Sequence, residues 1–158
     1  MQITILSVGK IKEPFVLDGI KQYQKYLRTF ANMSFEHVNP AHIPKNPSEG
    51  DIKQVRIKEA SLLRKKLKPA YKVALTPEGK MLSSEKFARL LKDIGIYKDS
   101  KITVLIGGSY GLDESIKREC DSCISLSKLT FPHQLTALIV TEQIFRAFKI
   151  NNKEPYHK

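Results

Sequence analysis

Three turns in the second half of the chain have residue types that suit ligand binding: "LTPEG" (75–79), "GGSYG" (107–111) and "SLSKLTFPHQ" (125–134). Each follows a predicted strand, and the carboxyl ends of parallel strands meet at one edge of an open sheet. Glycine in the second turn lets the backbone approach a bound molecule closely. That turn has neither the G-K-[ST] of a phosphate-binding loop nor the G-x-G-x-x-G of a dinucleotide fold. We predict a pocket for an adenosine held without a phosphate anchor; a plain strand-to-helix connection is the alternative.

The elements that must position these turns alternate along the chain. Runs of β-branched residues predict strands, and apolar residues at helical spacing predict helices. The predicted strands are 2–8, 33–38, 71–82 with a break at Pro77 and Gly79, 101–108 and 123–127; the predicted helices are 13–28, 50–68, 84–94, 113–123 and 132–150. This alternation predicts an α/β fold, a mostly parallel open sheet with helices on both faces, in a single domain covering 1–158.

The charge of the chain favours a polyanionic partner. Lysine and arginine number 27 against 16 acidic residues, a net charge of +11. Much of the excess lies on the predicted helix 50–68, and RNA is favoured over a membrane because this helix lacks bulky apolar anchors. No apolar run reaches the roughly 20 residues of a membrane span. We therefore expect a soluble, cytoplasmic protein, with the proline-containing loop 39–50 as a segment that becomes ordered on binding.

The two cysteines, in "CDSC", have a spacing that suits a redox pair or half of a zinc site. A structural zinc ion needs four ligands, and the nearest histidine lies ten residues further on. The predicted helix 113–123, which Asp113 would cap, contains Ile116, Cys120 and Cys123 at spacings of four and then three residues. We interpret both cysteines as small core residues on one helix face and expect no metal.

The last predicted helix is apolar around most of its circumference, from Leu135 to Ile150. Apolar residues on all sides indicate burial on all sides. Because a chain this small cannot easily wrap one helix completely, we expect a homodimer formed through this helix. Within the helix, Glu142 and Arg146 are spaced to form an ion pair.

The sequence resembles the RlmH family of small SPOUT-class methyltransferases almost from end to end. The resemblance is carried by "ITILSVGKIKE", "EGKMLSSEKFA", "VLIGGSYGL", "ISLSKLTFPHQ" and "EQIFRAFKINNKEPYHK". The combination of I-G-G-x-x-G, S-x-x-T-[FL]-P-H and a terminal P-Y-H-[KR] is specific, although each motif alone is weak. The resemblance implies a C-terminal trefoil knot, a homodimer and S-adenosyl-L-methionine as cofactor. It also implies methylation of N3 of a pseudouridine in 23S rRNA, on the assembled ribosome.

The resemblance also implies which residues contact the cofactor. They follow the third and fourth predicted strands or lie in the last of the three turns. They are Leu75, Gly107, Leu126, Ser127, Lys128, Leu129, Thr130 and Phe131.

The implied reaction needs groups that remove a proton from an imide nitrogen and hold the base. His133 and His157 are the candidate proton acceptors, because imidazole titrates near neutrality. Tyr156, Arg146 and Lys158 are candidates for orienting the base or stabilising charge on its carbonyl oxygens. Other roles stay open: His133 as a residue that shapes the cofactor loop, the tail as a disordered end, and Arg146 as a register-fixing partner of Glu142.

One position departs from the family pattern. Where similar proteins have P-H-x-x-x-R, this chain has Ala137. If the missing arginine binds RNA or polarises the base, the chain is slower, chooses another substrate, or is a divergent paralogue. The competing hypothesis is therefore a non-catalytic dimer that binds cofactor and ribosome; a redox protein that uses Cys120 and Cys123 is a third.

Overall fold

The computed structural model describes residues 1–97 and 100–157. Its centre is a parallel sheet in which β1 and β4 are neighbours. The strands are β1 (Gln2–Val8), β2 (Asn32–Val38), β3 (Tyr71–Met81), β4 (Lys101–Ile106) and β5 (Ser122–Ser125), in the spatial order β2-β1-β4-β3-β5. All four strand pairings are parallel, so the predicted sheet type is confirmed.

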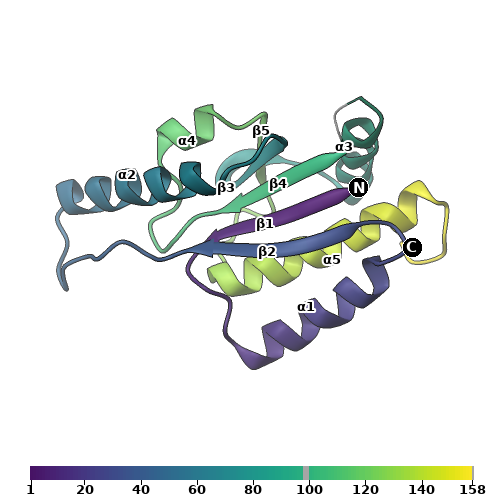
Figure 1. Ribbon diagram of the computed structural model, residues 1–158, viewed down its shortest axis with the longest axis horizontal. Helices are drawn as coiled ribbons and strands as arrows, with labels where there is room; N and C mark the ends of the chain where they lie inside the picture. Colours follow the sequence, from purple (N-terminus) through teal and green to yellow (C-terminus); the bar gives the residue numbers. More distant parts are fainter. Residues whose placement is uncertain (98–99, 158) are drawn as a thin grey trace.

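Helices cover both faces of this sheet (Figure 1). They are α1 (Pro14–Leu27), α2 (Glu49–Lys66), α3 (Ser84–Tyr97), α4 (Glu114–Arg118) and α5 (His133–Asn151). Helix α5 packs against α1 and α3 on one face, while α2 and α4 contact each other on the opposite face. The predicted α/β architecture with two helical layers is therefore confirmed. Among the described residues, no helix is both long enough and apolar enough to cross a membrane.

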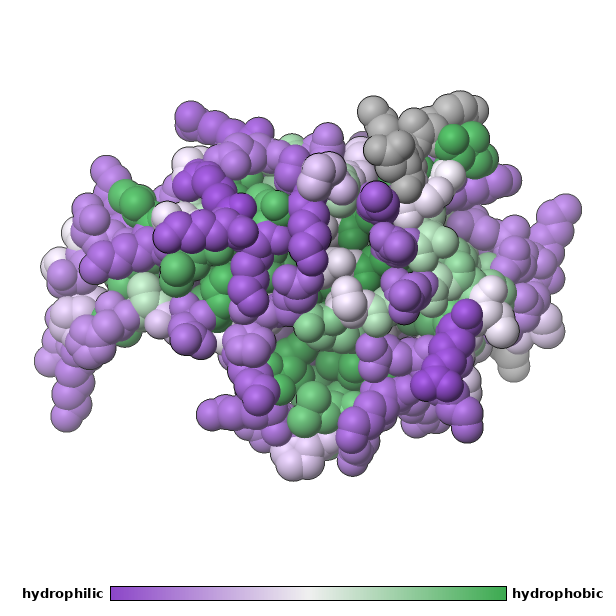
Figure 2. Space-filling view, viewed as in Figure 1, coloured by the Kyte–Doolittle hydropathy of each residue, from purple (hydrophilic) through white to green (hydrophobic). Residues whose placement is uncertain are grey.

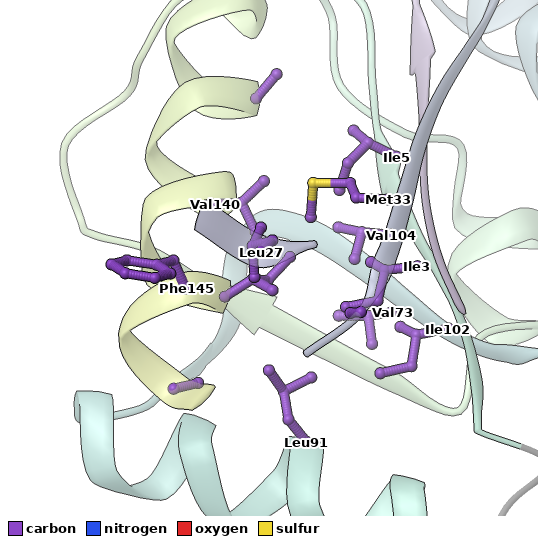
Figure 3. Packing of buried hydrophobic residues seen from close by; sticks show 14 of the residues in the cluster. Ile3, Ile5, Leu27, Met33, Val73, Leu91, Ile102, Val104, Val140 and Phe145 are labelled. Carbon is purple, nitrogen blue, oxygen red and sulfur yellow. The ribbon is translucent and has the colours of Figure 1, made fainter. Parts of the chain in front are cut away.

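The strands are apolar along most of their length because both faces of the sheet are buried. In β1, Ile3 and Ile5 belong to the core beneath α1, α3 and α5, whereas Leu6 and Val8 belong to the core beneath α2 and α4. Figure 3 shows the first core, with Val140 of α5 facing the sheet. These two cores hold the carboxyl edge of the sheet in place, and the three turns begin there.

The segment with the two cysteines differs from the prediction. Helix α4 ends at Arg118, and Cys123 lies on β5 instead of sharing a helix face with Ile116. The cause is pairing with β3, since Lys72 N donates to Asp121 Oδ2 at 2.7 Å and Asp121 N donates to Lys72 O at 2.9 Å. Both thiols are half-buried against the core beneath α2 and α4. Burial raises the pKa of Cys120 to about 11, which disfavours the thiolate that redox chemistry needs.

The predicted break in the third strand is confirmed: β3 runs to Met81, and its pairing with β5 shifts between Leu75 and Lys80. One further boundary differs from the prediction. Helix α2 begins one residue earlier than predicted, because Ser48 and Asp51 form a reciprocal capping box. Ser83 caps α3, since its hydroxyl accepts from Lys86 N at 3.3 Å.

Candidate functional site

A cavity of about 440 Å³ lies where β4 and β5 end and β3 changes its register. The three turns identified in the sequence form its walls. Its volume is within the usual range of about 300–1,000 Å³ for small-molecule sites. The parallel sheet therefore brings three segments that are distant in sequence to one site, as expected at the carboxyl edge of such a sheet.

Most of the residues predicted to bind a cofactor line this cavity. They are Leu75, Gly107, Leu126, Ser127, Leu129, Thr130 and Phe131. Lys128 is exposed and does not belong to the lining. Residue-by-residue prediction missed further lining residues. Those in the same turns are Thr76, Pro77, Gly108, Ser109, Gly111, Ser125 and Pro132; Ile106 lies at the end of β4 and Thr136 in the first turn of α5. The turns themselves were the signal that could have identified them.

The glycines of the second turn are needed by the turn itself. A Cβ atom on Gly107 would lie 2.6 Å from the carbonyl carbon of Gly111 and 2.8 Å from Leu112 N. Gly111 has φ +78°, and its N–H donates to Gly108 O at 3.0 Å. Glycine at 107 is therefore required because the bend folds back on its own backbone, rather than to leave room for a ligand. Gly111 borders open space and faces the cavity.

The lining is almost uncharged. Within the described part of the chain it contains no lysine, arginine, aspartate or glutamate, and His133 is its single ionisable side chain. Such a surface suits a neutral, largely aromatic ligand with hydroxyl groups, and it offers a phosphate no cation. The geometry therefore agrees with the prediction of a nucleoside pocket without a phosphate anchor.

His133 is the first residue of α5 and stands at the wall of the cavity. Its ring hydrogen-bonds to the backbone of Lys10, while Nε2 is buried and has no hydrogen-bond partner among the described residues. Burial lowers the pKa of His133 below its ordinary value, and the positive end of the helix dipole also disfavours the imidazolium. The ring is therefore neutral at pH 7 and able to accept a proton.

The neighbouring Gln134 joins the start of α5 to the loop after β1. Its side-chain oxygen accepts hydrogen bonds from Lys12 N at 2.7 Å and Glu13 N at 2.8 Å. Together with the bond from His133 to Lys10, these contacts fix the loop 9–13 against the cavity wall. No local pattern in the sequence indicates this link, because the partners are more than 120 residues apart.

A polar network supports the first turn from outside. The hydroxyl of Thr76, which lines the cavity, donates a hydrogen bond to the Glu78 carboxylate. Lys117 Nζ of α4 lies 3.0 Å from Glu78 Oε1. The hydrogen bond from Thr76, assisted by Lys117, lowers the pKa of Glu78 to about 2. Glu78 is therefore ionised at any pH at which the protein works, and it holds the Thr76 side chain in one orientation.

Three of the predicted catalytic residues lie together around Glu142 at the other end of α5. Glu142 Oε1 is 2.6 Å from Arg146 Nη2, and it accepts a hydrogen bond from the Tyr156 hydroxyl at 3.1 Å. The ring of His157 lies 3.4 Å from Arg146 Nη1 and 2.8 Å from Glu85 Oε1. We call these five residues the tail cluster. Lys158 lies outside the described residues.

Charges and burial set the protonation of the tail cluster. The carboxylate of Glu142 raises the pKa of Arg146, and burial raises the pKa of Tyr156, so both keep their protons. Hydrogen bonds from Ser83 and from His157 lower the pKa of Glu85 to about 2. Arg146 and Tyr156 are therefore suited to donate hydrogen bonds or to stabilise negative charge, and not to remove a proton.

The tail cluster and the cavity are far apart within one chain. Arg146 comes thirteen residues after His133 on the same helix, so the rise along α5 separates them by about 20 Å. The structure thus groups His133 with the cavity and groups Arg146, Tyr156 and His157 with each other. Ala137 is fully buried in the core, where its carbonyl accepts from the Thr141 hydroxyl at 2.6 Å.

Comparison with known proteins agrees with this arrangement of fold and cavity. The chain matches the family described as "Predicted SPOUT methyltransferase" over residues 1–157. Proteins named ribosomal RNA large subunit methyltransferase H are similar over 100% of both chains. Those of Bifidobacterium adolescentis, Exiguobacterium sp. and Listeria monocytogenes are 42%, 43% and 43% identical to it. The chain therefore belongs to the SPOUT methyltransferases, in the RlmH family of ribosomal RNA large subunit methyltransferases.

Proposed function

We propose that this protein transfers a methyl group from S-adenosyl-L-methionine to N3 of a pseudouridine in 23S rRNA, on the assembled ribosome. The observation that carries the proposal is the uncharged cavity enclosed by three turns, with His133 as its single ionisable side chain in the described chain. The names of the similar proteins support large-subunit ribosomal RNA as the substrate. The choice of N3 of a pseudouridine rests on the family resemblance.

The cavity residues fit this cofactor. Adenosine and its sulfonium side chain carry no phosphate, and the lining offers no cation to bind one. Leu75, Leu129 and Phe131 provide apolar contacts for an adenine ring, while Ser127 and Thr130 provide hydroxyl groups. Bound here, S-adenosyl-L-methionine would supply a methyl group already activated for transfer. The protein must then align the target nitrogen and exclude water.

His133 is the residue we assign to proton removal at N3. The imide nitrogen must lose its proton during transfer, and a neutral imidazole at the cavity wall is the group best suited to accept it. The N–H bond of the base breaks, and its proton moves to a ring nitrogen of His133. Arg146 and Tyr156 keep their protons and would stabilise the negative charge on the carbonyl oxygens of the base, with His157 and Lys158 orienting it.

We infer a homodimer formed through α5, because the tail cluster cannot reach the cavity of its own chain. Figure 2 shows hydrophobic side chains gathered over the region that α1 and α5 occupy in Figure 1. Phe15 at the start of α1 is 65% exposed, and Leu138 and Ile139 of α5 are only half-buried. A two-fold interface over this surface would place the tail of one protomer beside the cavity of its partner. The remaining circumference of α5 is covered by α1 and α3 of the same chain.

We also infer a trefoil knot in the last third of a single domain covering 1–158. The family resemblance and the match to the SPOUT methyltransferase family over residues 1–157 support it. A cytoplasmic location follows from a ribosomal substrate.

The test combines purified protein, labelled S-adenosyl-L-methionine and ribosomes that lack the modification. Label should appear on the pseudouridine of 23S rRNA, and His133→Gln should lower the rate without lowering ribosome affinity. Absence of label beside an active control enzyme would reject the proposed reaction. Calorimetry with the cofactor alone then separates an inactive cofactor-binding protein from one that does not bind the cofactor.

A further inference from the structure

The outer surface of α2 is a basic surface that the proposed reaction does not use. Between Ile52 and Lys66 the helix has six lysine or arginine residues and one acidic residue, Glu59. Glu59 is only 5% exposed and faces inward. The helix therefore presents positive charge to solvent without intervening negative charge after its first turn. Figure 2 shows hydrophilic side chains over this helix.

Four of these cations are exposed and have no recorded ion pair. They are Lys53, Lys58, Lys65 and Lys66, and the structure gives none of them an ion pair with a described residue. By contrast, Arg64 is paired with Glu119, with 2.6 Å between Nε and Oε1. From Lys53 to Lys65 the helix rises about 18 Å, which is long enough to follow several successive phosphates of a nucleic acid strand.

The inner surface of α2 is fixed to the wall of the cavity. Arg56 Nε donates to the backbone oxygen of Tyr110 at 2.7 Å, within the bend 107–111. Glu59 accepts from Ala41 N at 3.1 Å and packs against Gly108, which lines the cavity. A ligand held on the outer surface of α2 is thus held at a fixed distance from the cavity.

The basic surface continues beyond the end of α2. A small cavity of about 70 Å³ lies there, lined by Lys66, Lys68 and Lys101. Glu36 is its single acidic lining residue in the described chain, and it pairs with Lys68 at 3.2 Å. Basic residues therefore continue from the end of α2 to the amino edge of the sheet, at Lys68 and Lys101.

We propose that the outer surface of α2 docks the phosphate backbone of the substrate RNA, with Lys53, Lys58 and Lys65 as its principal contacts, and so positions the target nucleotide over the cavity. This inference rests on the proposed function. Charge complementarity identifies the partner, because phosphates are the ligands that exposed lysines without a recorded ion pair attract. Ile57, 40% exposed, is the single large apolar side chain strongly exposed on the described helix, too little for a membrane or an apolar protein surface.

The experiment uses two full-length variants with the same change in charge. Lys58→Glu/Lys65→Glu reverses two cations seven residues apart on the same side of α2. Lys25→Glu/Lys92→Glu is the matched control, because both lysines are exposed on α1 and α3, on the other side of the sheet. Lys58→Gln/Lys65→Gln removes the charges while keeping good helix formers, in case the reversal perturbs the helix.

Three quantities are measured for each protein. The first is its affinity, over a range of salt concentrations, for large ribosomal subunits that lack the modification. The others are the methylation rate and the affinity for S-adenosyl-L-methionine. We expect the α2 variants to bind the subunits at least tenfold more weakly than the control. For Lys58→Gln/Lys65→Gln, the plot of log affinity against log salt concentration should become less steep. Its slope should decrease in magnitude by about 0.7 for each phosphate that the variant no longer neutralises. Cofactor affinity should be unchanged.

The outcomes separate this inference from the proposed function. If the unaltered protein methylates no ribosomal particle, the proposed reaction is wrong. If it does, and the α2 variants bind and react like the control, the docking surface is wrong. If the variants lose affinity for subunits but bind protein-free large-subunit RNA as the unaltered protein does, α2 contacts a ribosomal protein, which also overturns the inference.

Discussion

His133 combines two properties that a proton acceptor needs, a place in the lining of the cavity and a neutral ring, while its unpartnered Nε2 is buried beside Gly9. Burial is the main cause of its lowered pKa, and the positive charge of Lys12 adds to it. The hydrogen bond to the backbone of Lys10 acts in the opposite direction, and the lining has no carboxylate among the described residues.

The pH dependence of methyl transfer should reflect the lowered pKa of His133. Only the neutral ring accepts a proton, so the rate should be constant above about pH 6.5, the ordinary value for histidine, and should fall as the pH drops through the lower pKa of this residue. Single-turnover rates on ribosomes measured from pH 5 to 8 provide the test. His133→Gln should lower the plateau about 100-fold and remove the fall at low pH. A fall that persists in this variant would assign the proton transfer to another group.

Glu59 is a buried carboxyl, and burial raises its pKa. A carboxyl with a raised folded-state pKa stabilises the protein below its unfolded pKa, and this contribution is lost as the pH rises through the folded-state value. The free energy of unfolding of Glu59→Gln should therefore increase relative to the unaltered protein as the pH rises from about 4.3, the ordinary value for glutamate. Denaturant unfolding at several pH values measures this difference. A difference independent of pH would show that Glu59 does not titrate abnormally.

Individual residues were predictable where they follow a strand in a recognisable turn. The turns containing Leu75, Gly107 and Phe131 could be located from the sequence because each follows an apolar run. Glu59 could not be found in this way, because a glutamate in a lysine-rich helix has the sequence signature of an exposed residue. Its burial is decided by the bend 107–111 and by Ala41, which approach α2 only in the folded chain.

Among the elements, β3 and β5 approach so closely that one position has no room for a side chain. A Cβ atom on Gly79 would lie 2.6 Å from the carbonyl carbon of Ile124 and 2.7 Å from its nitrogen. Gly79→Ala should therefore destabilise the protein by about 1 to 3 kcal/mol. It should also weaken cofactor binding, because the cavity borders this contact. The matched change Gly50→Ala, in the first turn of α2, meets nothing closer than Ser48 Oγ at 3.6 Å. It should raise the stability by up to about 1 kcal/mol.

Thermal and denaturant unfolding of both alanine variants, followed by calorimetry with the cofactor, would check these effects. Equal stability of the two variants would contradict the close approach of the strands.

The elements of the fold could be predicted largely because both faces of the sheet are covered. Complete burial makes β4 a continuous apolar run, and such runs are visible without a structure. The segment 119–123 could not be assigned, because its helical spacing competes with pairing to β3. The two hydrogen bonds between Lys72 and Asp121 decide the competition in favour of the strand. They join residues nearly fifty positions apart, which no local pattern records.

For the whole molecule, the separation of His133 and Arg146 by about 20 Å along α5 predicts a shared site between two protomers. If each cavity uses the tail cluster of its partner, an Arg146→Ala protomer and a His133→Gln protomer complement each other. Random mixing of the two inactive proteins should restore about a quarter of the original activity, because half of the dimers are mixed and each has one intact site. Activity of the remixed proteins is measured after co-refolding. No recovery would assign both residues to one chain.

The contacts of Gln134 with the loop after β1 have a consequence for how the protein is made. Gln134, which immobilises Lys12 and Glu13, is more than 120 residues away from them, and β1 pairs with β4, about 100 residues away. Until these later segments have been synthesised, the loop after β1 lacks its contacts with Gln134, and β1 lacks its neighbour β4. A ligand of the cavity cannot stabilise an intermediate that lacks these distant contacts, because the turn 125–134 forms one of the cavity walls. Folding should therefore be slow, in the manner of folds with distant pairings.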